Sequence, residues 1–348
     1  MEKRILIRRW LGPETQFIPI YDEASVSSAR QRVRDAGQPL NLSKELVESV
    51  ALIASELTHN HLRHAKQGYF GVRPIEHGGQ KGLEVIAADL GPGIEKPGAA
   101  IRGQMPKETG SLGAGIAAVC RLADEVAWDN RISEGACIIA RKFETAAASL
   151  CEAAVMSRPY PGEPISGDDA IIIQSEAGFL AAVSDGLGHG PEAREASNHA
   201  IEVVSKSTQD DLDQIAIRIN QELAGTRGCA ISLMRFIRND GALEYVSAGD
   251  VYAHLYHLRD AHFFTPTPMV LGTGQLRAQK LRIERTEVKP NSVLVMFTDG
   301  LKSRTTLKGE LDVLRQPAIV IAQHLLDTHS RPDDDALVCV VRFTVPQT

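Results

Sequence analysis

The sequence predicts a two-domain chain of the mixed α/β (α+β) class, with antiparallel sheets in its second domain. The chain has 348 residues, of which 43% are hydrophobic, and this is enough for a core in each of two domains of ordinary size. From residue 150 onward, short apolar runs alternate with turns, and helical spacing is seen at 193–205 and 212–223. Many strands without regular βαβ alternation favour antiparallel sheets covered by helices. We place the domains at 1–145 and 150–348, joined by a short alanine-rich linker.

The first domain is expected to begin with a strand at 4–7 and a helix at 25–35. A longer helix follows from Ser43, a plausible N-cap, because apolar residues recur behind it at helical spacing. Glu56 and Asn60 are four residues apart, so they share one edge of that helix. From spacing alone, these two side chains are expected to lie at a solvent-exposed edge of the helix. The two glycine-rich motifs that follow favour a role for them in a binding site.

Two glycine-rich turns follow the long helix. An apolar strand ends in Asp89, with Gly91 and Gly93 close behind it, so that a flat ligand can approach the backbone while the acid accepts hydrogen bonds. The second turn, 110–115, runs into a helix at 116–122, and such a turn can bind phosphates. Neither a P-loop motif nor a complete βαβ dinucleotide fingerprint is present in the sequence, which argues against those two nucleotide-binding classes.

The order Glu-x-x-x-Asn, Asp-x-Gly-x-Gly and second glycine-rich turn resembles the Bergerat ATP-binding fold of the GHKL superfamily. From about residue 3 to residue 143, the sequence is most similar to the anti-sigma-type switch kinases of this superfamily, in particular the RsbT-like serine/threonine kinases. The resemblance implies an α/β sandwich that binds ATP with Mg²⁺. It also implies that Asp89 binds the adenine amino group, that Asn60 holds Mg²⁺ against the phosphates and that Glu56 is the general base. The glycines that would shape the pocket are Gly91, Gly93, Gly113 and Gly115.

The second domain places acids at the ends of its apolar runs. Asp185 ends the run 179–183, and three glycines occur in the next five residues. One such Asp-Gly is usually only a turn, but acids also stand at strand ends at 168–169, 299 and 333–335. Carboxylates gathered in this way need a cation among them, and without His or Cys at matching positions Mg²⁺ or Mn²⁺ is favoured over zinc. Two such ions can ionise a bridging water and hold a phosphoryl group.

From about residue 150 to 343, these motifs resemble the PP2C-like (PPM) metal-dependent serine/threonine phosphatases, in the SpoIIE/RsbX branch. The resemblance implies an α-β-β-α sandwich with two Mn²⁺ or Mg²⁺ ions and a catalytic Asp185 that contacts both. Asp169 beside Asp168, and Ala336 where the family usually has Thr, leave the choice between neighbouring acids open at these two clusters. The implied metal ligands are Asp168, Asp185, the Gly186 carbonyl, Asp299 and Asp333.

Composition excludes several other classes. The net charge is −6 with dispersed Lys and Arg, which argues against a nucleic-acid surface. The sequence shows no leader and no apolar run approaching ~18 residues, so we expect a cytoplasmic chain without membrane segments. His59, His61 and His64 crowd the end of the long helix, and we interpret them as a wet helix end rather than a zinc site.

Together the motifs predict a bifunctional signalling enzyme, a serine/threonine kinase joined to a metal-dependent phosphoprotein phosphatase. By resemblance the partner is a STAS-domain anti-anti-sigma or stressosome-like phosphoprotein, and a sigma factor is a further candidate. One alternative is a phosphatase regulated by a non-catalytic ATP-binding domain. In that case the domain binds ATP without transferring phosphate and does not need Glu56 as a base. The other alternative is an anti-sigma-like module that sequesters its partner and needs no metal cluster.

Overall fold

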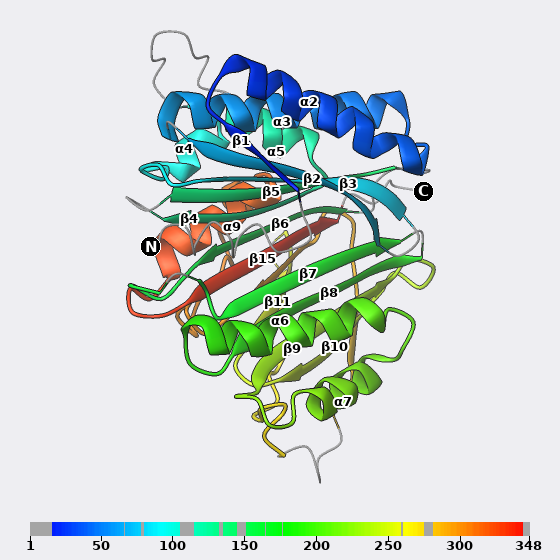
Figure 1. The fold of residues 1–348 in the computed structure, drawn as a ribbon. Coiled ribbons are helices and arrows are strands. Elements are labelled where there is room, and N and C mark those ends of the chain that lie inside the picture. Colours follow the sequence, from blue (N-terminus) through cyan, green and yellow to red (C-terminus); the bar gives the residue numbers. More distant parts are fainter. Residues whose placement is uncertain are drawn as a thin grey trace. The chain divides into compact units, whose positions relative to one another are not determined.

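The computed structural model divides the chain into two compact units, Met1–Ala148 and Ser149–Thr348, which Figure 1 shows as ribbons. The description below covers residues 16–65, 67–77, 80–104, 115–131, 135–144, 151–163, 165–175, 177–258, 260–274 and 281–343. The strand expected at 4–7, the predicted pocket glycine Gly113 and most of the expected linker lie outside these residues. Each unit is described by itself.

The first unit contains an antiparallel sheet in the order β1-β2-β3-β5-β4. Residues 83–88 of β3 are buried on both faces of the sheet, as expected for a central strand. The strands are β1 (Phe17–Ile20), β2 (Gly68–His77), β3 (Gln80–Asp89), β4 (Glu125–Arg131) and β5 (Gly135–Phe143).

Helices cover one face of this sheet (Figure 1). Asp22 caps the first of them in a capping box with Ser25, and Ser43 caps the longest by accepting from the Leu46 amide at 3.3 Å. The prediction of a helix starting after Ser43 is therefore confirmed. The helices are α2 (Glu23–Gly37), α3 (Lys44–Asn60), α4 (Pro97–Ile101) and α5 (Gly115–Leu122), with a 3₁₀ turn η1 (Gln38–Leu40) and a π-helical turn η2 (His61–Ala65) that continues α3.

The second unit contains two antiparallel sheets. Every apolar run expected to be a strand lies in one of them, so the predicted antiparallel architecture is confirmed. One sheet has the order β13-β10-β9-β8-β7 and the other contains β6-β15-β14-β11-β12. The strands are β6 (Cys151–Arg158), β7 (Asp168–Ser175), β8 (Gly178–Gly186), β9 (Cys229–Ile237), β10 (Ala242–Ala248), β11 (Tyr252–His257), β12 (Asp260–Phe263), β13 (Glu284–Glu287), β14 (Val293–Phe297) and β15 (Ala336–Phe343).

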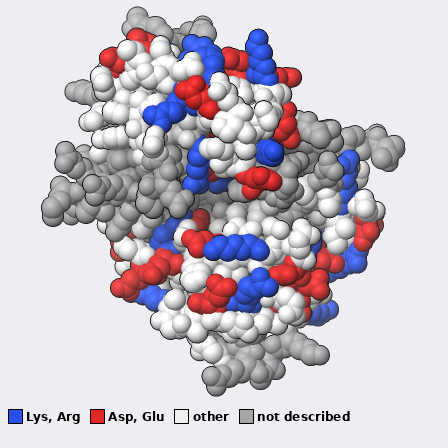
Figure 2. All heavy atoms as spheres, turned by 45° about the vertical axis from the view of Figure 1, so that its right-hand side comes forward, with Lys and Arg blue, Asp and Glu red and all other residues white. Residues whose placement is uncertain are grey.

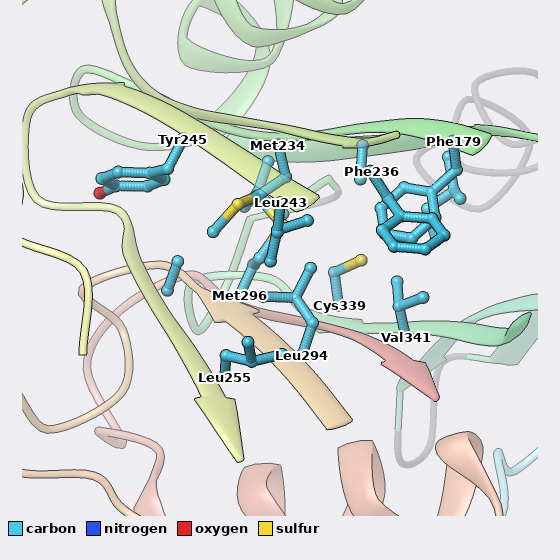
Figure 3. Close-up of a cluster of buried hydrophobic side chains, with 14 of the residues drawn as sticks. Phe179, Met234, Phe236, Leu243, Tyr245, Leu255, Leu294, Met296, Cys339 and Val341 are labelled. Carbon is cyan, nitrogen blue, oxygen red and sulfur yellow. The ribbon is translucent and has the colours of Figure 1, made fainter. Parts of the chain in front are cut away.

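A hydrophobic core joins the two sheets (Figure 3). Phe179 and Phe236 from one sheet pack with Phe343 from the other, with ring centroids 5.0–5.7 Å apart. Met234 and Met296 belong to the same cluster from opposite sheets. Such interdigitation is the packing expected of a β-sandwich.

Helices cover both outer faces of the sandwich. The predicted helices at 193–205 and 212–223 appear as α6 (Gly190–Lys206) and α7 (Leu212–Glu222), and they share a second core with β8, β9 and β10. On the other sheet, α9 (Ala318–His329) packs against β6 and β15, and the short α8 (Leu311–Leu314) precedes it. The second unit is thus the expected α-β-β-α sandwich.

Candidate functional site

In the first unit, Glu56 and Asn60 face the start of α5. A Cβ added at Gly115 would lie 2.8 Å from Glu56 Oε2 and 3.5 Å from Asn60 Oδ1. A side chain at residue 115 would therefore crowd both polar groups. A carboxylate and an amide side chain are therefore gathered at the start of α5, and a helix start can offer free backbone amides to an anion.

Asp89 ends β3 in the same unit, and the glycine two residues later donates a hydrogen bond to its side chain. Its Oδ1 accepts a hydrogen bond from the Gly91 amide at 2.7 Å. Burial raises the pKa of Asp89, and the Gly91 hydrogen bond opposes that rise. A Cβ at Gly91 would lie 2.9 Å from both Asp89 Oδ1 and the Ala65 side chain, and Gly93 has φ +71°. Both glycines are therefore required by the turn itself.

The expected wet helix end is wrong for His61. This side chain is 3% exposed, and burial lowers its pKa to about 4, so the ring is neutral. Its Nε2 lies 3.8 Å from Asp89 Oδ2. His59 is half-buried and bonds to the Ser55 carbonyl at 2.7 Å, while His64 is exposed. The three histidines thus differ in burial, although His61 contacts Asp89 and the charge of His64 lowers the pKa of the same carboxyl group.

In the second unit, Asp168 and Asp185 form a cross-strand pair. Asp168 begins β7, and the register of the β7–β8 ladder places it directly opposite Asp185. Asp168 is 1% exposed, and its Oδ2 accepts a hydrogen bond from the Thr298 hydroxyl at 2.8 Å. The predicted acids at 168, 185 and 299 are thereby brought to one end of the sandwich.

Electrostatics at this end are unbalanced. Burial raises the pKa of Asp168 well above its ordinary value, and Asp335 raises it further. Burial likewise raises the pKa of Asp185 well above its ordinary value, with Asp168 as the next cause. The pKa of Asp299 is also raised by burial, although Arg331 opposes that rise. A site of this kind favours bound cations, which stabilise the ionised carboxylates.

The structure separates the neighbouring acids that the sequence left open. Asp169 is paired with Arg194, with 3.1 Å between its Oδ2 and the guanidinium, whereas Asp168 faces the other acids. In the last cluster Asp333 is exposed, while Asp334 raises the pKa of both Asp168 and Asp185. Asp334 thus lies nearer the acids than Asp333, the residue that the sequence favoured.

Gly186 allows α6 to approach β8, because a Cβ there would clash with the Ala193 carbonyl. The Gly186 carbonyl, which the sequence predicted as a ligand, belongs to the residue directly after Asp185 at the end of β8. Among the described residues, no three or more His, Cys, Asp or Glu side chains are arranged closely enough to hold a metal ion as they stand. The donors present are nevertheless oxygens, the ligand type of Mg²⁺ and Mn²⁺.

Sequence reasoning did not identify Arg194 or Arg331 as part of this site. Arg194 lies on α6 and holds Asp169 away from the other acids. The Arg331 amide donates to the Gly300 carbonyl at 2.7 Å, and its charge lowers the pKa of both Asp299 and Asp334. The sequence feature that could have identified Arg331 is its position two residues before the last acidic cluster.

The surface of the described residues adds two observations. Basic and acidic side chains are interspersed on the face shown in Figure 2, which does not present the clustered positive charge that nucleic-acid binding needs. Within the described ranges, every helix is too short or too polar to cross a membrane.

Two family models match the chain, one for each unit. The model of the histidine kinase-like ATPase domain matches residues 21–142, and that of stage II sporulation protein E (SpoIIE) matches residues 175–344. Serine/threonine-protein kinase RsbT of Bacillus subtilis (strain 168) is 33% identical over 129 residues, which is 36% of this chain and 94% of RsbT. Phosphoserine phosphatase RsbX of the same organism is 28% identical over 140 residues, 40% of this chain and 69% of RsbX.

Solved structures resemble the chain as well. A chain from a study of the bacterial stressosome, described as a modular system adapted to control secondary messenger signaling, has a TM-score of 0.53 at 27% identity. The match covers the whole of that chain and 56% of this one. RsbX in complex with magnesium has a TM-score of 0.50 at 22% identity and covers 56% of this chain and 95% of its own length. The latter likeness concerns the fold alone.

Proposed function

The chain belongs to the RsbT family of serine/threonine kinases through its first unit and joins that unit to a SpoIIE-type PPM phosphatase domain, and from this premise we propose that it both adds and removes phosphate on one partner protein. The proposal unites an ATP-dependent kinase and a metal-dependent phosphoprotein phosphatase. The single observation that carries its phosphatase half is the cross-strand pairing of Asp168 with Asp185 beside Asp299 and Asp334.

We infer that this cluster holds two Mn²⁺ or Mg²⁺ ions. Bound ions would supply an acidified water as nucleophile and would neutralise phosphoryl oxygens. Asp168 and Asp299 both raise the pKa of Asp185, which supports the proposal that the three carboxylates would hold the same ions. The proposed ligands are Asp168, Asp185, the Gly186 carbonyl, Asp299 and, in place of Asp333, Asp334.

In the kinase unit, Glu56 would act as general base. A base must lie close to the phosphates so that it can reach the hydroxyl of the protein substrate, and Glu56 is next to the helix start at Gly115. Asn60 would hold Mg²⁺, and Asp89 would accept the adenine amino group. The pocket would be shaped by Gly91, Gly93, Gly113 and Gly115.

The partner is proposed to be a STAS-domain anti-anti-sigma or stressosome-like phosphoprotein, with a sigma factor as an additional output partner. What supports this is that the two curated relatives are a kinase and a phosphoserine phosphatase of the same organism. The placement of Glu56 beside Gly115 favours catalysis over a purely regulatory ATP domain. The cross-strand pair of Asp168 and Asp185 favours catalysis over simple sequestration of a partner.

The test uses the full chain with Asp185→Asn as a trap for phosphorylated substrate. Incubation with ATP and Mg²⁺, capture of bound proteins and phosphosite mapping should give a STAS-domain protein modified at Ser or Thr. The wild-type chain with Mn²⁺ should then remove that phosphate. A captured protein that Glu56→Gln phosphorylates as fast as the wild type, or whose phosphate survives wild-type treatment, would contradict the bifunctional assignment.

A further inference from the structure

His61 lies buried directly behind the carboxylate at the end of β3. Its Nε2 is 3.8 Å from Asp89 Oδ2, while the other oxygen, Oδ1, accepts from the Gly91 amide at 2.7 Å. The Gly91 and Ala136 amides both bond to the Asp89 carboxylate, and the His61 imidazole is the neighbour of Oδ2 that is not yet at hydrogen-bond distance. A hydrogen bond from His61 to Oδ2 would add a side-chain restraint to the two backbone amides that orient the carboxylate.

The position of the ring proton follows from the opposite nitrogen. Nδ1 of His61 has no hydrogen-bond partner among the described residues, and it faces Gly68, where a Cβ would clash with the ring. A buried N–H without an acceptor is rarer and less tolerated than a buried acceptor without a donor. The single proton of the neutral ring therefore belongs on Nε2, the nitrogen nearer Asp89.

A histidine that only fills space would explain the packing but not this arrangement. An apolar side chain would occupy the same volume without leaving Nδ1 unpaired. In addition, residue 68 is paired with Asp89 in the β2–β3 ladder, and its missing side chain is the space that the imidazole occupies. Gly68 thus admits the ring next to the strand end that carries the carboxylate.

We propose that His61 is a positioning residue for adenine recognition, whose Nε2–H closes on Asp89 Oδ2 and holds the carboxylate in the orientation that accepts a purine 6-amino group. This inference rests on the proposed ATP site. At 3.8 Å the contact is longer than a hydrogen bond, so a small movement of the carboxylate or ring completes it. His61 acts through Asp89 and does not itself contact the nucleotide.

The test compares two nucleotides on the full chain by titration calorimetry with Mg²⁺. ATP carries the 6-amino group, and purine riboside triphosphate lacks it. His61→Met keeps the side-chain length without a donor and should weaken ATP binding about fivefold, the value of one net hydrogen bond, while binding of the analogue stays unchanged. His61→Gln restores an N–H donor at similar reach and should recover most of the loss.

His59→Gln is the matched control, because His59 bonds to Ser55 and Glu23 and should leave both affinities unchanged. Equal weakening of both nucleotides in His61→Met, loss of both, or no change in either would overturn the inference, since each leaves His61 without a role specific to the amino group. If the wild-type chain binds neither nucleotide, the proposed ATP site itself fails, and this result is distinct from the others.

Discussion

Asp168 and Asp185 lie directly opposite each other in the ladder between β7 and β8, although like charges at opposite positions of an antiparallel pair destabilise it. Asp168 is buried and Asp185 is half-buried, and the pKa values of both are raised well above the ordinary value. This relationship is unfavourable for the fold alone, and it becomes favourable when cations join the pair.

The first prediction is that Asp185→Asn melts higher than the wild type in EDTA at pH 7.5. Because the folded-state pKa of Asp185 is raised, the folded chain binds more protons than the unfolded chain between the two pKa values, so stability falls as pH rises through that window. Asn removes this loss. We expect a gain of at least about 2 °C, the shift that 1 kcal/mol gives in a domain of this size.

Calorimetric melting of both proteins from pH 5 to 8 checks this prediction. The difference in melting temperature between the variant and the wild type should narrow as pH falls. Mn²⁺ should raise the melting temperature of the wild type more than that of the variant. An Asp185→Asn protein that is less stable than the wild type in EDTA would show that the carboxylate is held by protein contacts and not by a missing cation.

The second prediction concerns turnover. Asp185→Asn should reduce hydrolysis of p-nitrophenyl phosphate by more than about 100-fold, beyond the ~10–100-fold cost of losing a partner that only orients a ligand. EDTA should abolish wild-type turnover, and Mn²⁺ or Mg²⁺ should restore it. Activity that survives EDTA would remove the metal mechanism.

The third prediction decides between neighbouring acids. Asp334→Asn should raise the Mn²⁺ concentration needed for half-maximal turnover by at least ~10-fold, whereas Asp333→Asn should behave as the wild type because Asp333 is exposed. A Mn²⁺ titration of phosphopeptide hydrolysis measures both. The reverse result would return the ligand to Asp333, as the sequence suggested.

The fourth prediction separates nucleotide binding from transfer. Glu56→Gln should keep the ATP affinity within about twofold of the wild-type value, because the substitution preserves the size of the side chain. It should lower the rate of phosphotransfer ~10²–10⁴-fold, because the side chain loses its basicity. Asp89→Asn is the companion variant and should lose ATP binding, since its amide replaces an acceptor with a donor. Calorimetry and phosphate transfer to the captured partner measure the two effects. Transfer at the wild-type rate would make Glu56 structural.

Much of the second unit could be predicted from sequence because its strands are short apolar runs bounded by turns. The helix α9 was missed because Ala318, Val320, Ile321 and Leu325 are all buried, which leaves little of the polar stripe that marks an amphipathic helix. Strands β2, β4 and β5 were also missed. Pro74 and the several charged residues within these strands hide the usual pattern.

The site was less predictable than the fold because adjacent residues in a strand point to opposite faces. Asp168 faces the other acids while Asp169 pairs with Arg194, and sequence could not say which would do which. The burial of His61 depends on Gly68, a contact between a helix end and a strand. Such contacts follow from tertiary packing and leave no periodic signal.

Thr298 connects the two sheets of the sandwich at the acidic cluster. Its hydroxyl donates to Asp168 Oδ2 at 2.8 Å on the β7 side and accepts from the Leu337 amide at 3.0 Å on the β15 side. The cluster is therefore assembled only when both sheets are docked. Metal affinity should accordingly be coupled to cooperative unfolding. Binding of a divalent ion should slow the exchange of protected amides in β7 and in β15 together.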